Sequence, residues 1–159
     1  MATNGSKDVF LCFPANITYL AWVHSLFDRV AEDYGLSLQR KHRLLVAVSE
    51  AFTNAVIHGS GQNKHAVVEV NVTSDNTWLK IEIIDSGQGL AKLPPETSWG
   101  QVGPDSECGR GLELMRGLSD KLEFAEAPEG GLAVRLHYNI SGARTRRRGS
   151  LIADENVEV

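Results

Sequence analysis

Two pairs of alternating segments constrain the fold most strongly. Over residues 68–72 and 79–83, apolar side chains occupy every second position, and a few polar residues separate the two runs. A period of two on both sides of a short polar turn predicts an antiparallel hairpin with one buried face. The segments 122–125 and 132–140 predict a second hairpin around a Glu-Gly-Gly turn. Two such hairpins need a further layer to bury their apolar faces.

Apolar positions at helical spacing predict three helices that can supply this layer. The first is expected to have Asn16 or Thr18 as its cap and to stop at Gly35, and the second runs from a cap at Ser37 to Gly59. The third helix is predicted to begin at Gly111. The sequence therefore predicts an α+β fold: a two-layer α/β sandwich with a mixed, mainly antiparallel sheet and about three helices on one face.

The chain is expected to form one domain. A short apolar run at residues 9–13 adds a strand, so the domain is predicted over 9–140, between a flexible N-terminus at 1–8 and a disordered, arginine-rich tail at 141–159. Residues 86–108 are rich in Gly, Pro and Ser, which predicts a long functional loop.

Composition narrows the class of protein. The 159 residues carry a formal charge of −4, which does not favour a general nucleic-acid or anionic-membrane surface. No window approaches the apolar length of a membrane helix, and the two cysteines have no metal-binding spacing. We therefore expect a soluble, cytoplasmic protein without a membrane or direct nucleic-acid partner.

The first of three short motifs is Glu50-x-x-x-Asn54-x-x-x-His58. Residues four apart share one face of a helix, so the three side chains should form a polar ridge. An Asn oxygen suits the coordination shell of Mg²⁺, and a Glu one turn away could orient or deprotonate a hydroxyl. Taken alone, the spacing also fits an ordinary solvated helix face.

The second motif is Asp85-x-Gly87-x-Gly89, directly after an apolar strand. An ionised Asp accepts hydrogen bonds and would suit the exocyclic amine of adenine, whereas the carbonyl of guanine would be repelled. Glycines allow the backbone to approach a flat base closely. A simple Asp-Ser-Gly turn remains the alternative.

The third motif is Gly109-Arg110-Gly111-Leu112, at the expected start of the third helix. Unpaired backbone N–H groups at a helix N-terminus bind phosphate well, and Arg110 could add charge-assisted bonds. An ordinary glycine-rich helix entry would give the same residues. The segment fits neither a Rossmann fingerprint nor a P-loop.

Together, the three motifs and their order resemble the GHKL superfamily of ATPases and kinases, which has the Bergerat fold. SEAFTNAVIHG and GRGLELMRGLSDKLEF are especially similar to its small anti-sigma-factor serine/threonine kinases. The resemblance extends over residues 9–140 and implies ATP and Mg²⁺ as cofactors. It implies a catalytic base at Glu50, Mg²⁺ at Asn54 and adenine at Asp85. The nucleotide site would also include His58, Gly87, Gly89, Gly109, Arg110, Gly111 and Leu112, with residues 91–108 as a lid over ATP.

The function implied is an ATP-dependent protein serine/threonine kinase that sequesters a sigma factor and phosphorylates a small antagonist protein. The resemblance also implies a homodimer. Two alternatives remain open: an ATP-gated binding switch without turnover, and a detached histidine-kinase-type catalytic domain. Candidate partner contacts are Trp22, Phe27 and Trp99, although Phe27 also suits the core.

Overall fold

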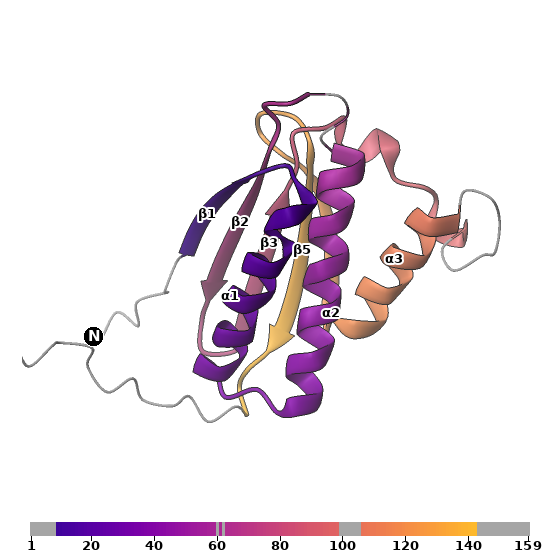
Figure 1. Ribbon diagram of the computed structural model, residues 1–159. Coiled ribbons are helices and arrows are strands. Elements are labelled where there is room, and N and C mark those ends of the chain that lie inside the picture. Colours follow the sequence, from indigo (N-terminus) through magenta and orange to yellow (C-terminus); the bar gives the residue numbers. More distant parts are fainter. Residues whose placement is uncertain (1–8, 60, 62, 99–105, 143–159) are drawn as a thin grey trace, which may run out of the picture.

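A five-stranded sheet forms one layer of the molecule and three helices form the other (Figure 1). The computed structural model describes residues 9–59, 61, 63–98 and 106–142. The strand order is β1-β2-β3-β5-β4. The strands are β1 (Val9–Pro14), β2 (Val67–Ser74), β3 (Trp78–Ile84), β4 (Lys121–Glu126) and β5 (Leu132–Asn139). The helices are α1 (Leu20–Asp33), α2 (Leu38–Asn54) and α3 (Ser106–Leu118).

The α+β sandwich and both hairpins are confirmed, but the sheet is not mixed. Every pairing among the described strands is antiparallel. The reason lies in β5, which inserts between β3 and β4 and runs antiparallel to both. In the first hairpin, Asp75 fixes the turn because its Oδ1 accepts the N–H groups of Thr77 and Trp78, each at 2.7 Å.

The predicted cap of the second helix is found, whereas α1 itself has Tyr19 at its N-cap position without a side-chain cap bond. The Ser37 side chain accepts the N–H of Arg40 at 3.3 Å and starts α2. Asn16 caps a 3-10 turn, Ile17–Tyr19, that leads into α1, and it accepts the N–H of Thr18 at 2.9 Å. Gly35 follows α1 with a φ of 63°, a conformation that glycine adopts without steric cost.

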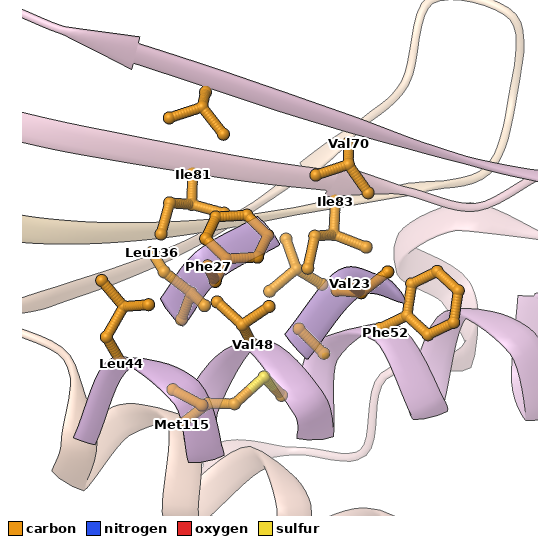
Figure 2. Close-up of a cluster of buried hydrophobic side chains, with 14 of the residues drawn as sticks. Val23, Phe27, Leu44, Val48, Phe52, Val70, Ile81, Ile83, Met115 and Leu136 are labelled. Carbon is orange, nitrogen blue, oxygen red and sulfur yellow. The ribbon is translucent and has the colours of Figure 1, made fainter. Parts of the chain in front are cut away.

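The core lies between the sheet and the helices (Figure 2). Phe27 of α1 and Phe52 of α2 are fully buried against strand residues such as Ile81. Burying a side chain of this size contributes about 1.5–3 kcal/mol relative to leaving it exposed. Phe27 is therefore a core residue, whereas Trp22 on the same helix is 72% exposed.

Two helix boundaries differ from the sequence prediction. The second helix is α-helical only to Asn54 and continues as a π-helical turn, Ala55–Gly59. The third helix begins at Ser106, five residues before the predicted start at Gly111. Packing explains why glycines are accepted inside α3: a Cβ on Gly111 would lie 3.0 Å from Glu50 Oε2. Close contact with α2 thus overrides the low helix propensity of glycine.

The predicted loop 86–108 contains two short 3-10 turns, η3 (Gly89–Lys92) and η4 (Glu96–Ser98), before α3. The expected flexible N-terminus 1–8 lies outside the described residues, as do Trp99 and the tail beyond residue 142. Within the described part of the chain, none of the helices has the length and apolar character needed to span a bilayer.

Candidate functional site

A cavity of about 270 Å³ opens where α2, α3 and the ends of β3 and β5 meet. Its lining combines residues of all three motifs with apolar side chains of the core. These residues are Asn54, Ala55, His58, Asp85, Gln88, Gly89, Leu93, Pro94, Leu112, Met115, Leu132 and Val134. An apolar cavity with a few convergent polar groups is typical of a small-molecule site.

Asp85 is the acidic residue of this lining, and backbone groups hold its carboxylate in place. Its Oδ1 accepts the N–H of Gly87 at 2.7 Å and the N–H of Leu132 at 3.1 Å. The Asp85 N–H in turn donates to the carbonyl of Leu132 at 3.1 Å. No described residue donates a hydrogen bond to Oδ2, so this oxygen is available to accept one from a ligand amine.

Three glycines surround Asp85 at distances that exclude any side chain. A Cβ on Gly59 would lie 2.2 Å from the Asp85 Cβ, and one on Gly131 would lie 1.9 Å from the Asp85 carbonyl oxygen. A Cβ on Gly87 would lie 3.0 Å from Asp85 Oδ1 and 2.9 Å from the Cα of Gly59. Gly87 therefore acts beside Asp85 rather than in the cavity lining.

The first motif is brought to the same place by the end of α2. The Nδ2 atom of Asn54 is buried and makes no hydrogen bond with any residue that the structure describes. Buried polar groups are normally paired, so an unpaired one at a cavity suggests a missing ligand. An amide can present either its nitrogen or its oxygen at such a position. Asn54 thus fits a site for Mg²⁺ bound together with phosphate oxygens and waters.

Glu50 lies one helical turn before Asn54 and outside the cavity lining. Its Oε2 and Asn54 Nδ2 both approach Gly111, at 3.0 and 3.2 Å from the position of an added Cβ. His58 does line the cavity, and it does so from the π-helical turn rather than from the α-helix. The three residues thus stay on one side of α2, but they are not the uninterrupted ridge that the spacing predicted.

The third motif is placed differently from the prediction. Because α3 begins at Ser106, Gly109, Arg110 and Gly111 lie within the helix and not at its exposed N-terminus. Gly109 and Gly111 are buried, and Arg110 is exposed. Leu112 is 2% exposed and lines the cavity. In this structure, the observed role of Gly111 is to let α3 pack against Glu50 and Asn54.

Several site residues were missed by the sequence reasoning. The apolar part of the lining, Ala55, Met115, Leu132 and Val134, lies in segments that were interpreted only as core helix or hairpin. In the sequence, Gly59 is the last residue of the predicted second helix, and Gly131 belongs to the predicted Glu-Gly-Gly turn. Their contact with Asp85 joins residues far apart in the chain, so local patterns could not reveal it.

Among the described residues, no three His, Cys, Asp or Glu side chains are grouped so that they could hold a metal ion. Mg²⁺ in nucleotide sites commonly keeps several waters and phosphate oxygens beside one or two protein ligands.

Comparison with known proteins identifies the class of site. A family model described as "Histidine kinase-like ATPase domain" matches residues 13–138. The chain belongs to this family. Membership implies ATP as the nucleotide, and the matched segment contains the whole cavity described above.

Individual relatives carry more specific names. The anti-sigma F factor of Bacillus subtilis is 31% identical over 102 residues, which are 61% of this chain and 68% of that protein. The serine-protein kinase RsbW of Bacillus subtilis is 28% identical over 147 residues, covering 89% of this chain and 91% of that protein. An anti-sigma F factor of Clostridium botulinum is 34% identical over 92 residues, or 64% of its length.

A solved structure supports the fold. The crystal structure of the RsbU and RsbW domains of a Mycobacterium tuberculosis protein aligns with a TM-score of 0.57 and 18% sequence identity. The alignment covers 82% of this chain and 32% of that one. At this identity, the likeness concerns the fold alone.

Proposed function

We propose that this protein is an ATP-dependent protein serine/threonine kinase that acts as an anti-sigma regulatory factor. It sequesters a sigma factor and transfers the γ-phosphate of ATP to a serine or threonine of a small antagonist protein. The observation that carries the proposal is that Asp85 and Asn54, whose buried amide nitrogen has no partner among the described residues, line one cavity, with Glu50 one helical turn before Asn54 and outside the lining. The names of the relatives, anti-sigma F factor and serine-protein kinase RsbW, support the same function.

The described residues fit adenine at one end of the cavity. Asp85 Oδ1 is already occupied by two backbone N–H groups, which leaves Oδ2 to accept from the exocyclic amine of the base. Leu112, Met115 and Val134 supply the apolar surface that a flat ring needs. Guanine carries a carbonyl where adenine carries the amine, so the carboxylate would repel it.

The other end of the cavity would hold Mg²⁺ and the phosphates. Mg·ATP, when bound, supplies the phosphoryl group, and Asn54 would contribute an amide oxygen to the metal. Glu50 would orient the attacking hydroxyl and accept its proton. Gly109, Arg110 and Gly111 remain proposed phosphate neighbours. They lie inside α3, and Gly111 is beside both Glu50 and Asn54.

An ATP-gated switch without turnover is the second candidate. The observation that favours it is the position of Glu50, whose carboxylate lies against Gly111 rather than in the cavity lining. For either function, Trp22 is the proposed partner contact, since it projects from α1 with 72% of its surface exposed. A homodimer is proposed from the resemblance to the kinase branch.

Phosphotransfer by the wild-type chain separates the two candidates, and a Glu50→Ala variant tests the role of the base. The chain is incubated with Mg·ATP and the partner proteins that co-purify with it, and both phosphotransfer and ATP affinity are measured. We expect Glu50→Ala to lose transfer by about 100-fold or more while ATP still binds, because general-base catalysis contributes about 10²–10⁴-fold. Glu113→Ala, at an exposed position of α3, is the control and should behave as wild type. Substantial transfer by Glu50→Ala would refute the base role.

A further inference from the structure

The turn η3 is capped by a side chain from another element. Gln88, at its N-cap position, makes no side-chain cap bond. Glu126, the last residue of β4, instead accepts the N–H of Leu90 on Oε2 at 3.3 Å. Gly89 has a φ of 68°, and the three atoms nearest to an added Cβ all belong to the Glu126 carboxylate, the closest at 2.3 Å. The Glu126 carboxylate thus lies close to Gly89, the first residue of η3, and accepts a hydrogen bond from Leu90, the second.

This turn forms one wall of the nucleotide cavity. Gly89, Leu93 and Pro94 all line it, and the Leu93 N–H donates to the carbonyl of Leu90 at 3.0 Å. Leu90 therefore donates its N–H to Glu126 and accepts, on its carbonyl, the hydrogen bond from Leu93 that closes the turn. Glu126 itself lies in the lining of a separate hollow beside β2, β3 and β5, not in that of the nucleotide cavity. Any effect of Glu126 on nucleotide is therefore indirect and acts through the backbone that it contacts.

The same end of the β4–β5 hairpin also contacts Asp85. Glu126 is the register partner of Leu132 in the β4–β5 ladder. The Leu132 N–H donates to Asp85 Oδ1 at 3.1 Å. The hairpin end is therefore in contact with both η3 and Asp85, so it can position both relative to one sheet edge.

We propose that Glu126 is a positioning residue of the nucleotide site, which fixes the wall Gly89–Pro94 by capping η3 from β4. The proposal rests on the proposed function, because it assumes that the cavity binds ATP. It predicts that the carboxylate acts through one hydrogen bond and one close backbone contact. A glutamine at this position retains an acceptor oxygen and should keep most of the effect, whereas an alanine should not.

The test combines amide hydrogen exchange of the nucleotide-free chain with Mg·ATP and ADP affinities by calorimetry. In Glu126→Ala, we expect the Leu90 amide to exchange about tenfold faster and both affinities to fall about five- to tenfold, since a net hydrogen bond contributes about this much. Glu126→Gln should stay within about threefold of wild type. The control is Glu129→Ala, in the exposed turn of the same hairpin, and should change neither readout.

A double-mutant cycle with Gly89→Ala tests the contact itself. Because the added methyl meets the Glu126 carboxylate, Gly89→Ala should cost much less affinity in the Glu126→Ala background than in wild type. Additive losses would overturn the proposal, and so would unchanged Leu90 exchange in Glu126→Ala. Faster exchange with unchanged ATP affinity would also overturn it while leaving the proposed function intact. A wild-type chain that binds no ATP would overturn both.

Discussion

Replacing Gly131 by alanine should displace Asp85, whereas the same change at Gly130 should not. The two glycines are adjacent in the β4–β5 turn and have similar φ angles, 91° and 85°. A Cβ on Gly131 would lie 1.9 Å from the Asp85 carbonyl oxygen and 3.2 Å from Oδ1, while one on Gly130 meets nothing within 4 Å. Comparing Gly131→Ala with Gly130→Ala therefore separates the effect of the steric contact with Asp85 from the effect of backbone strain, which both variants share.

The magnitudes follow from these distances. An L-residue at a positive φ costs about 1–2 kcal/mol, so both variants should lose about this much stability. In Gly131→Ala, the methyl group and the carbonyl must also separate by about 1 Å, which would move Asp85 within the cavity. Losing a well-aligned hydrogen bond to a charged acceptor costs about 1.5–3 kcal/mol, or roughly 10- to 150-fold in affinity.

The assay is ATP and GTP binding by calorimetry, with urea unfolding as a parallel measure of stability. We expect Gly131→Ala to weaken ATP binding at least about tenfold and to reduce the preference for ATP over GTP. Gly130→Ala should retain both properties. Equal losses of ATP affinity in the two variants would refute the claim that Gly131 positions Asp85.

Two further predictions concern helix α3 and the buried tyrosine. Gly111→Ala should reduce phosphotransfer, because the added methyl would lie 3.0 Å from Glu50 Oε2 and 3.2 Å from Asn54 Nδ2. At Gly117 in the same helix, an added Cβ meets no described atom within 4 Å. Gly117→Ala should therefore leave transfer unchanged and add about 0.5–1 kcal/mol to the free energy of unfolding. Equal transfer in these two variants would contradict the packing role of Gly111. The Tyr138 hydroxyl is buried and has no hydrogen-bond partner among the described residues, so Tyr138→Phe should be neutral or stabilising by up to about 1 kcal/mol in urea unfolding. Burial also raises the pKa of Tyr138 well above its usual range, so wild type should lose stability as pH rises above about 10 and Tyr138→Phe should lose less. Parallel pH profiles would argue against this effect of burial.

Local periodicity predicted the sheet because each hairpin buries one face. The alternation over 68–72 and 79–83 corresponds to β2 and β3 with the expected antiparallel pairing. Strand order and orientation depend on contacts between distant segments, so the position of β5 between β3 and β4, and with it an entirely antiparallel sheet, did not follow from the sequence.

For the candidate site too, local motifs predicted some residues, whereas contacts between distant segments were not predicted. Asp85 and Asn54 were predicted from short motifs, and the structure brings them to one cavity. Gly111 was predicted as the start of the third helix, but α3 begins at Ser106 and Gly111 packs on Glu50 inside it. Gly131 contacts Asp85 across 46 residues of sequence, so no local pattern could connect the two.

Transfer of phosphate from ATP to a hydroxyl of a partner protein can be measured through the acid stability of the phosphorylated partner. The partner is isolated after incubation with the chain and labelled Mg·ATP. We expect an acid-stable phosphoserine or phosphothreonine whose formation requires Glu50. An acid-labile phosphohistidine would rule out serine/threonine transfer, and nucleotide-dependent partner binding without any transfer would rule out kinase activity.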